Sequence, residues 1–551
     1  MVTKTKNKSA SQISDIVIDY AEGEFILWFP FNKTDLERVR NLPIRDWDKY
    51  KKHWKVPQLA ARSLDSLPAT WTETAKKYRL AIENLLINLA DDREIDESSD
   101  EGKLRPYQKT GVNYLTHAKK AILGDEMGLG KTIQSLTAII NAGLEKNLIV
   151  CPATLKGNWE RQFLEHFDIQ PLIIAGDPAK RKEQWKDDNP YKIANYDLLV
   201  RDWDHIPREW DSIVADECVY IKNHQAKRTK NLKKLKADYR FALSGFAMEN
   251  NLQEFHSIME WVRPEVIPNL FRFRQRYCKL DWAGQIVGYK NKSELQSLTG
   301  PFILRRKKSE VAKDLPPKIY SDFPLSMNRD TEAAYEYLSE EFYAWLKNMS
   351  GKEKNWHVSV LEKILRLRQF VEFPELVGFD SVSSIKMKWL EETYENVDKL
   401  VIFTYFKESA KKIAEHFGGY LLSGDVPQKD RLPIVQSFNS SSKKTVLAST
   451  DAGKFGLDIT GADTLVHFGY FYNPATMVQR EDRIHRIGQT ADSCHILRPY
   501  INNTIDVGIR NIYMDRLEEA YSFMDGQQEI SKTRLTKKDF INLVQGKYER
   551  K

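Results

Sequence analysis

The sequence predicts an α/β fold of two parallel-sheet lobes with helical insertions, preceded by a small α+β module. Three observations support this prediction. A chain of 551 residues exceeds what one hydrophobic core normally organises. In two separate stretches, continuous apolar runs alternate with amphipathic helical patterns, which is typical of parallel sheets covered on both faces. Short β-rich runs before residue 75 stand apart from both stretches.

The composition is that of a globular protein. Hydrophobic residues make up 41% and charged residues 29% of the chain, with 26 glycines and 21 prolines, which excludes a disordered or fibrous class. The net charge of +7 permits a polyanionic partner without requiring one. The four cysteines stand singly, without a CxxC pair or metal-ligand spacing, which favours a reducing compartment.

The chain lacks a stretch long and apolar enough to span a membrane, and its N-terminus lacks the pattern of a standard signal peptide. We therefore predict a protein with no membrane contact. We also expect it to be a monomer in solution. The predicted location is a bacterial or viral cytoplasm, in association with the nucleoid, and a nuclear location is the alternative.

The region before residue 103 divides into three parts. Residues 1–13 are polar and basic and are predicted to form a flexible tail. Residues 14–75 are predicted to form a small module, and the acidic residues 76–102 a linker. Within the module we expect a hairpin of IVIDY and EFILWF around the turn AEGE, the helix TDLERVRNL and a third strand, HWKVP.

Residues 103–310 are predicted to form the first lobe. Five apolar runs predict the strands of a buried parallel sheet: KKAIL, NLIVC, PLIIA, DSIVA and RFALS. The amphipathic run TIQSLTAIINAG lies between the first two and predicts a helix. This order of strands and helices requires helices on both faces of the sheet.

The α/β rhythm weakens and then returns. Residues 311–390 are predicted to form an inter-lobe linker and helical insertion, because DTEAAYEYLSEEFYAWLKNM and VSVLEKILRLRQF have helical patterns. Residues 391–515 are predicted to form the second lobe, with strands in KLVIFTYF, GYLLSG, KTVLAST, DTLVHFGY and CHILRPY. Residues 516–551 are predicted to form a basic C-terminal tail.

The stretch ILGDEMGLGKT, residues 122–132, follows an apolar strand and opens a helix. Backbone N–H groups of such a turn and of the helix N-terminus converge on one point, where an anion is favoured. Lys131 would add a charge at the β- and γ-phosphates, and Thr132 a hydroxyl for Mg²⁺. The familiar phosphate loop has glycine where this chain has Asp125. An ordinary strand-to-helix turn is the alternative.

A second polar site is predicted at the end of the apolar strand DSIVADE, where Asp216 and Glu217 are adjacent. Two such carboxylates can divide the work of hydrolysis: Asp216 holds hydrated magnesium, and Glu217 orients and deprotonates the attacking water. The dipeptide alone carries little information. Because it follows a buried strand downstream of GKT, we predict a Walker-B-like site.

In the second lobe, QREDRIHRIGQT places Arg483 and Arg486 three residues apart, on one face if the segment is helical. Two guanidinium groups that face one way suit a phosphate group. An exposed basic helix is the alternative.

These motifs belong to a longer series. In order, the chain contains LRPYQKTGVNYL, GDEMGLGKT, IVCPATLKGNW, VADE, PFILRRKKSEVAKDLPPK, LASTDAGKFGLDITGADT and QREDRIHRIGQT. The series spans residues 103–495 and resembles that of Swi/Snf-type helicase-like ATPases of superfamily two. By this resemblance the lobes are RecA-like, the cofactors are ATP and Mg²⁺, and Asp125 is a family variation of the loop.

The resemblance implies a set of site residues. ATP contacts are expected from Gln108, Asp125, Gly128, Gly130, Lys131, Thr132, Gly456, Asp458 and Gln479, with the Gln108 amide at the adenine edge. The expected catalytic residues are Lys131, Asp216, Glu217, Arg483 and Arg486, and the expected metal ligands are Thr132 and Asp216. The arginines would reach across the cleft, with Arg486 as the arginine finger, so hydrolysis would be fast only when the cleft closes.

The same resemblance implies that duplex DNA is the partner, held through its backbone and tracked along one strand without base readout. Segments that follow sheet strands in both lobes offer hydroxyls, glycine N–H groups and lysines. The expected contacts are Thr154, Lys156, Asn158, Trp159, Ser449, Thr450 and Lys454. Packing inside the lobe is the alternative for Trp159.

The sequence departs from the family pattern at three places. Cys218 and Val219 follow the DE pair where the family has a small residue and histidine, and Phe246 replaces a hydroxyl residue in SGFA. Asp451 and Lys454 stand where the family commonly has arginine and glycine. The first two sites ordinarily help one lobe to sense what the other has bound, so they motivate an alternative: a DNA-binding scaffold that holds ATP with little turnover.

The run DKYKKHWKVPQLAARSL in the first module resembles the HARP-type substrate-recognition module of annealing helicases. By this resemblance Lys51, Lys52 and Lys55 would meet phosphates while Trp54 packs. A β-rich appendage that stabilises the first lobe is the alternative. The leading hypothesis is therefore a DNA-dependent ATPase that translocates on duplex DNA and remodels branched or forked DNA. Its rival in the same class is a translocase that clears bound proteins, such as polymerase, from DNA.

Overall fold

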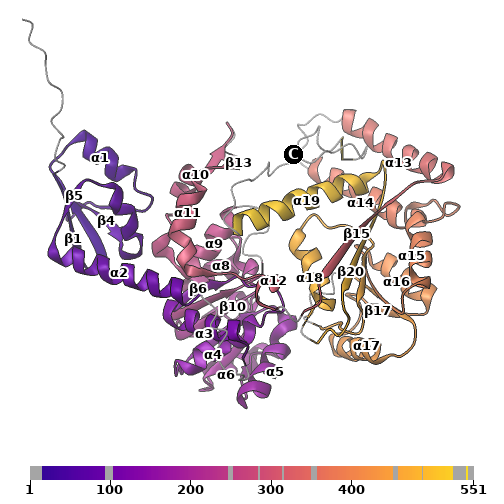
Figure 1. The fold of residues 1–551 in the computed structure, drawn as a ribbon, viewed down its shortest axis with the longest axis horizontal. Helices are drawn as coiled ribbons and strands as arrows, with labels where there is room; N and C mark the ends of the chain where they lie inside the picture. Colours follow the sequence, from indigo (N-terminus) through magenta and orange to yellow (C-terminus); the bar gives the residue numbers. More distant parts are fainter. Residues whose placement is uncertain are drawn as a thin grey trace, which may run out of the picture.

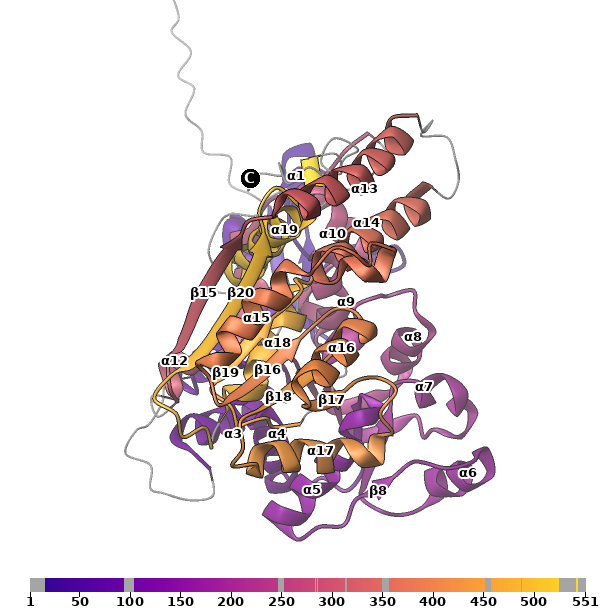
Figure 2. The ribbon, with the colours of Figure 1, turned by 90° about the vertical axis from the view of Figure 1, so that its right-hand side faces the viewer.

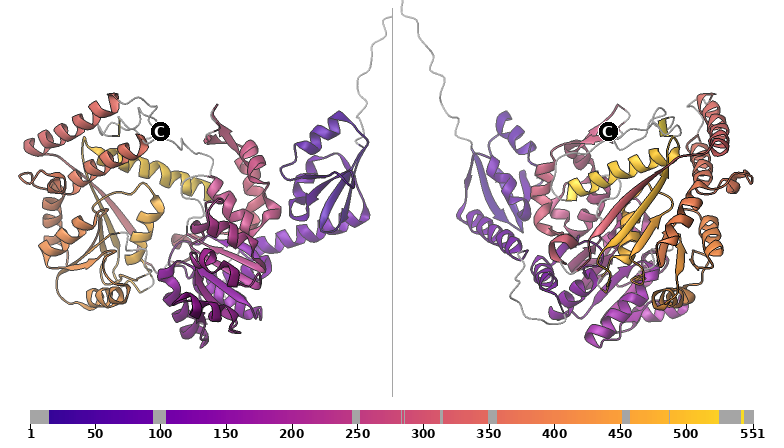
Figure 3. Two further views of the ribbon diagram at one scale, coloured as in Figure 1. Left: turned by 180° about the vertical axis from the view of Figure 1, so that it is seen from behind. Right: turned by 45° about the vertical axis from the view of Figure 1, so that its right-hand side comes forward.

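A computed structural model describes residues 15–93, 104–245, 252–282, 284, 286–312, 315–348, 356–450, 457–486, 488–524 and 542–543. Three parts follow one another along the chain: an N-terminal sheet module, lobe one and lobe two (Figure 1). The two lobes lie side by side, and helix α19 (Ile505–Met524) runs from lobe two back towards lobe one (Figures 1 and 3).

The module is a five-stranded sheet in the order β3-β4-β2-β1-β5. Its elements are β1 (Ile16–Ala21), β2 (Glu24–Trp28), α1 (Lys33–Arg40), β3 (Asp46–Asp48), β4 (His53–Pro57), η1 (Gln58–Ser66), β5 (Ala69–Trp71) and α2 (Glu73–Asp91). β1 and β2 form the predicted antiparallel hairpin. Its turn residues Glu22 and Gly23 have φ of 55° and 83°, the left-handed conformation that a tight hairpin turn requires.

The core of the module is continuous with that of lobe one. Buried side chains from β1 to β14 (Ile303–Leu304) of lobe one belong to a single hydrophobic cluster. Beyond the end of α2, the Arg93 guanidinium donates a hydrogen bond to the Ile303 carbonyl at 3.0 Å. The module therefore packs on lobe one. This packing agrees with the alternative interpretation of its sequence as a β-rich appendage of that lobe.

The predicted linker at 76–102 is wrong over residues 76–91, which belong to α2. The buried side chains of this helix include Ile82, Leu86 and Leu89, which recur at the spacing of one helical face. The acidic residues that suggested a linker begin only in the last turn of the helix.

Lobe one is a seven-stranded sheet in the order β14-β6-β11-β10-β7-β9-β8, in which neighbouring strands are parallel. Its other strands are β6 (Lys120–Leu123), β7 (Asn147–Cys151), β8 (Leu172–Ile173), β9 (Tyr191–Asn195), β10 (Glu209–Asp216) and β11 (Lys236–Leu243). The five predicted strands are all confirmed. The short strands β9 and β14 were not predicted.

The helices of lobe one are α3 (Pro106–Ala118), α4 (Lys131–Asn141), α5 (Lys156–Phe167), α6 (Pro178–Lys186), α7 (Leu198–Arg201), α8 (Lys227–Lys234), α9 (Leu252–Val262), α10 (Leu270–Tyr277), α11 (Lys292–Thr299) and α12 (Lys308–Val311). A hairpin of β12 (Cys278–Leu280) and β13 (Ile286–Tyr289) projects beyond α10 (Figure 1).

Lobe two is a six-stranded sheet in the order β15-β20-β19-β16-β18-β17, also parallel throughout. Its strands are β15 (Lys318–Leu325), β16 (Lys399–Phe403), β17 (Tyr420–Leu422), β18 (Thr445–Ser449), β19 (Thr464–His467) and β20 (Cys494–Ile501). Its helices are α13 (Arg329–Asn348), α14 (Trp356–Glu372), α15 (Ile385–Glu395), α16 (Lys407–Phe417), α17 (Gln428–Ser440), α18 (Pro474–Ile484) and α19.

Helices cover both faces of the lobe-two sheet, as its continuous apolar strands require. Side chains of α15 and α16 pack on one face, and those of α17 and α18 on the other. Figure 2 shows α15 and α16 in front of the strands. Among the described residues, no helix combines the length and apolarity that crossing a bilayer needs.

The segment 311–390, predicted as a linker with a helical insertion, contains the edge strand of the second sheet. β15 pairs with β20 over eight positions, from Lys318 with Cys494 to Leu325 with Ile501. The prediction missed β15 because half of its side chains are polar or charged, as befits an edge strand. Lobe two therefore begins at β15 and not at residue 391.

We predict that deleting residues 1–93 lowers the melting temperature of the remaining chain by roughly 5 °C or more, because the deletion uncovers the part of lobe one that α2 packs on. Differential scanning calorimetry measures this, with deletion of residues 1–13 alone as the control. An unchanged melting temperature after the longer deletion would show that the module folds independently.

Candidate active site

The phosphate-loop motif lies between β6 and α4, at the carboxyl end of a strand that lies between β14 and β11 in the sheet of lobe one. Gly128 and Gly130 have φ of 86° and 75°, in the left-handed region that favours glycine. A Cβ at Gly130 would lie 2.4 Å from the Gln108 side-chain nitrogen. α4 begins at Lys131 without a side-chain cap, so its first N–H groups remain suited to an anion.

Lys131 folds back over the loop. Its ammonium donates hydrogen bonds to the backbone carbonyls of Asp125 at 2.8 Å and Glu126 at 3.2 Å. Burial lowers the pKa of Lys131, whereas Glu217 favours its charged form, and Asp482 of lobe two does so to a lesser extent. Lys131 is thus positioned at the loop that would hold the phosphates.

Asp125 does not face the phosphate side of the loop. Its carboxylate is fully buried and pairs with the guanidinium of Arg306, whose Nε donates to Oδ1 at 3.0 Å. The Gln134 amide donates to Oδ2 at 3.2 Å. The expected ATP contact of the Asp125 side chain is therefore corrected: the carboxylate anchors the loop from below.

Gln108 is buried against the same loop. Its side-chain oxygen accepts from the Arg105 backbone N–H at 3.0 Å, and its side-chain nitrogen donates to the Leu129 carbonyl at 3.3 Å. Both polar ends of the amide are engaged in this arrangement, and its predicted role at the adenine edge stays a prediction.

The carboxylates Asp216 and Glu217 lie at the end of β10. The Trp159 indole donates to Asp216 Oδ2 at 2.8 Å, and the Glu217 backbone N–H donates to Oδ1 at 2.9 Å. Burial raises the pKa of Asp216, and these two hydrogen bonds oppose the rise. Glu217 has φ of 48°, an unfavourable backbone conformation for a residue with a side chain. Strain of this kind clusters at functional sites.

Trp159, predicted to contact DNA, has no exposed surface. Its indole fills the core beneath β10 and orients the Asp216 carboxylate. The packing alternative is therefore correct, and the prediction of a DNA contact is wrong for this residue.

Lobe two presents the C-terminal end of α18 to this site. Arg483 is 3% exposed, and its Nε and Nη1 have no hydrogen-bond partner within the described part of the chain. Burial and, to a lesser extent, the neighbouring Arg486 lower the pKa of Arg483 to about 9, while Asp458 and, in lobe one, Glu217 oppose the shift. A buried guanidinium with unused donors suits an oxyanion.

Arg486 lies against the phosphate loop. A Cβ at Gly128 would lie 3.7 Å from its side-chain Cγ. Its guanidinium pairs with the Asp458 carboxylate, and its Nε donates to the Asp482 carbonyl at 3.0 Å. Asp458, predicted as an ATP contact, is therefore engaged with Arg486 in this structure. Gln479 lies on α18 and is partly exposed.

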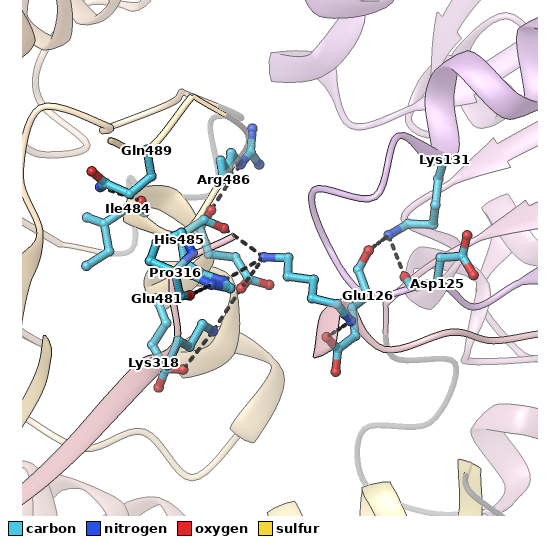
Figure 4. A network of polar contacts seen from close by, with 12 residues as sticks. Asp125, Glu126, Lys131, Pro316, Lys318, Glu481, Ile484, His485, Arg486 and Gln489 are labelled. Carbon is cyan, nitrogen blue, oxygen red and sulfur yellow. Dashed lines mark hydrogen bonds and ion pairs between the residues drawn. The ribbon is translucent and has the colours of Figure 1, made fainter. Parts of the chain in front are cut away.

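Lys308 joins the two halves of the site and was not predicted. Figure 4 shows the residues around this junction, with Glu126 and Lys131 on the side of lobe one and His485 and Arg486 on the side of lobe two. The Lys308 ammonium donates to Asp482 Oδ1 and to the His485 carbonyl, both at 2.8 Å, and burial lowers its pKa to about 8. Arg306 and Lys308 both belong to the basic run RRKK. The density of charge after an apolar strand was the available signal, although it did not identify the partners.

The site fits a nucleotide with magnesium. The orphaned donors of Arg483, the free N-terminus of α4 and Lys131 would hold phosphate oxygens. Asp216 and Thr132 supply one carboxylate and one hydroxyl. Among the described residues, no group of three histidine, cysteine or acidic side chains could hold a metal. Mg²⁺ needs no such group, because phosphates and water complete its shell.

The residues predicted to contact DNA are only partly available. Thr154, Lys156 and Asn158 are partly exposed beside α5, and the Lys156 ammonium donates to the Ile174 carbonyl at 3.0 Å. Ser449 and Thr450 are buried. Four further residues lie outside the described residues: the predicted contacts Lys454 and Gly456, and the departures from the family pattern at Phe246 and Asp451.

The module lysines differ in availability. Lys52 is exposed, with φ of 52° in a tight turn. The Lys55 ammonium lies 3.3 Å from Glu24 and 3.4 Å from Asp48, so two carboxylates already offset its charge.

Two adjoining RecA-like lobes with a phosphate loop, paired carboxylates and arginines at their junction define a nucleotide hydrolase of the helicase-like class. Residues 107–376 match the SNF2-related domain, and residues 385–488 match the helicase conserved C-terminal domain. Together these matches include most of lobe one, part of lobe two and more than half of the chain. The chain belongs to the SNF2-related ATPases of helicase superfamily two.

Several known proteins are similar to this chain. An uncharacterized ATP-dependent helicase of Mycoplasma genitalium is 29% identical over 471 residues, covering 81% of this chain and 44% of that protein. A putative ATP-dependent helicase/translocase of Bacillus subtilis is 29% identical over 427 residues, covering 71% of this chain and 45% of that protein. The chain thus spans less than half the length of these relatives.

A solved structure, the Sulfolobus solfataricus SWI2/SNF2 ATPase core in complex with dsDNA, is 27% identical to this chain with a TM-score of 0.40. The comparison covers 82% of this chain and 98% of that one.

We predict that Trp159→Phe moves the acid limb of the ATPase pH profile upward by about one unit. The substitution removes a hydrogen bond to the buried Asp216 carboxylate, so its pKa rises further and it takes up a proton at a higher pH. Steady-state ATPase rates between pH 5 and 8 measure the shift.

Trp185→Phe is the matched control. The Trp185 indole is also buried and also donates to a carboxylate, that of Asp202 at 3.0 Å, away from the site. This variant should lose comparable stability without moving the pH profile. Equal shifts in the two variants would contradict a specific role for Trp159.

Proposed function

We propose that this chain hydrolyses ATP between its two lobes and uses the resulting motion to translocate on duplex DNA. The observation that carries this proposal is the buried guanidinium of Arg483 in lobe two, whose unused donors lie near Glu217 and Arg486. An oxyanion at this place would satisfy groups from both lobes at once. Nucleotide binding and lobe closure would then be one event.

Each residue has a role that follows from its position. Lys131 and the N–H groups at the start of α4 would hold the β- and γ-phosphates. Glu217 would orient a water molecule and accept its proton. Arg483 and Arg486 would stabilise the charge that develops on the transferring phosphoryl group. Mg²⁺, held by Asp216 and Thr132, would supply charge neutralisation when bound.

The proposed partner is duplex DNA, contacted through its backbone. Lys156 and Thr154 lie beyond the carboxyl end of β7, which supports a backbone grip on that edge of lobe one. Such contacts carry charge and shape but little sequence information, so binding should be strongly salt dependent.

We propose in addition that the module directs the enzyme to branched or forked DNA. An exposed turn that contains Tyr50 and Lys52 supports this proposal, and the Tyr50 side chain is 85% exposed. An aromatic ring beside a positive charge suits unpaired bases and phosphates. The ion pairs of Lys55 limit the contribution of that residue. Clearance of bound proteins and a scaffold with little turnover are the competing functions that the experiments below separate.

We predict that Arg483→Ala and Arg486→Ala each lower kcat for ATP by about 10³, while Glu217→Gln abolishes turnover and retains ATP binding. The physical reason is loss of transition-state stabilisation in the first two variants and of water activation in the third. ATPase kinetics and ATP affinity measure these effects, with the exposed Arg329→Ala of lobe two as the control. If native protein binds ATP with negligible turnover, the scaffold alternative is correct.

We predict that duplex DNA raises the ATPase rate of the native chain at least about tenfold, and that the gain falls steeply as salt rises. Tyr50→Ala with Lys52→Gly should reduce activation by forked DNA more than activation by linear DNA. Glycine suits the positive φ of residue 52, so the change removes charge without backbone strain. The exposed Lys182→Ala is the control.

The comparison of the two DNA substrates separates the functions. Absence of stimulation by any duplex would exclude translocation. Equal loss on forked and linear DNA would exclude fork recognition by the module and leave protein clearance as the better reading.

A further inference from the structure

The segment after β14 runs alongside the phosphate loop. The Gly124 N–H donates to the Leu304 carbonyl at 2.7 Å, and the Glu126 N–H donates to the Arg306 carbonyl at 3.1 Å. The Lys308 backbone N–H in turn donates to the Glu126 carboxylate at 2.8 Å. The backbone of Lys308 is therefore fixed to the loop of lobe one.

The side chain of Lys308 contacts lobe two through Asp482 and His485. Its ammonium has three hydrogen-bond partners at the end of α18: Asp482 Oδ1 at 2.8 Å, the His485 carbonyl at 2.8 Å and the His485 ring Nδ1 at 3.3 Å. An ammonium has three N–H groups, so all are used. The other ring nitrogen of His485 lies 2.7 Å from the Pro316 carbonyl, which fixes the ring.

The residues that Lys308 contacts lie next to the two arginines of the site in the sequence. Asp482 precedes Arg483, and His485 precedes Arg486. The same Asp482 also supplies the backbone carbonyl to which Arg486 Nε donates at 3.0 Å. Lys308 holds the residue that precedes each arginine. It therefore fixes the backbone position from which both arginine side chains extend.

The energetic cost of this arrangement argues for a directional role. Lys308 is 4% exposed, and burial lowers its pKa to about 8 even beside Asp482. A buried charge of this kind adds little to overall stability. Its three directed hydrogen bonds instead select one relative position of the lobes.

We propose that Lys308 is a positioning residue that pins the end of α18 against the phosphate loop and so places Arg483 and Arg486 at the transferring phosphoryl group. This role rests on the proposed ATP hydrolysis between the lobes. The pinning itself exists without nucleotide and can be tested separately.

Lobe separation is the first measurement. Cysteines introduced at Lys182 of α6 and Lys411 of α16, both exposed, take a donor and an acceptor dye, while the four native cysteines are buried. Single-molecule energy transfer without nucleotide should give one narrow population for the native chain. Lys308→Met should broaden that population and shift it to lower transfer efficiency.

Turnover is the second measurement. Lys308→Met should lower kcat about 100-fold, because misplaced arginines lose their transition-state contacts, while the Kd for ATP changes less than about threefold. With Asp482→Asn already present, the further loss caused by Lys308→Met should be much smaller, since both residues make the same contact.

Lys318→Met is the matched control. The Lys318 ammonium contacts the same Asp482 oxygen at 2.9 Å, but from β15 inside lobe two. This variant should lower the melting temperature while retaining the native lobe distance. The proposal is overturned if Lys308→Met keeps the native energy-transfer distribution, or if Lys318→Met reproduces its change. If the native chain does not hydrolyse ATP, the proposed function fails, and the nucleotide-free distances still decide the role of Lys308.

Discussion

Pairing of buried charges around the boundary between the lobes is the interaction on which the site depends. Arg306 neutralises Asp125 beneath the phosphate loop, and Lys308 neutralises Asp482 at the end of α18. Each of these charges would be costly to bury alone. A short stretch of backbone after β14 joins the two pairs, because Arg306 and Lys308 both lie in it. This one segment of chain therefore holds both the phosphate loop and α18.

Arg483 differs from these pairs because its guanidinium forms no ion pair within the described part of the chain, although the charges of Asp458, Glu217 and Asp482 favour its protonated form. Its guanidinium is as buried as Lys308, yet two of its donors have no partner among the described residues. Its unused donors suit an oxyanion. If a nucleotide phosphate met them, the binding free energy of the nucleotide would depend on lobe two being in place. The proposed coupling of chemistry to motion rests on these unused donors.

Much of the fold and part of the site could be predicted because the signals are local. The loop DEMGLGKT, the pair Asp216 and Glu217, and the spacing of Arg483 and Arg486 each lie within a few residues of a recognisable strand or helix. The ion pair of Asp125 could not be predicted, since its partner is 181 residues away in sequence. Trp159 illustrates the same limit: only the packing of α5 on the sheet shows that the indole faces Asp216 and not solvent.

The module shows how core packing can change the meaning of a sequence pattern. Three of its five strands were predicted, but the short strands β3 and β5 were not. Acidic residues near the end of α2 obscured that helix, and the shared core was not visible in the sequence. The matched domains begin at residue 107, beyond the module. Because the module shares its core with lobe one, a preference for branched DNA would have to come from the exposed surface of the module.

The central claim is that one ATP is touched by both lobes at once. The most direct measurement is photolabelling with an ATP analogue that carries its reactive group on the γ-phosphate, followed by mass spectrometry of the labelled peptides. The account predicts label both in the phosphate loop around residues 124–132 and at the end of α18 around residues 482–486. Label confined to lobe one would contradict it.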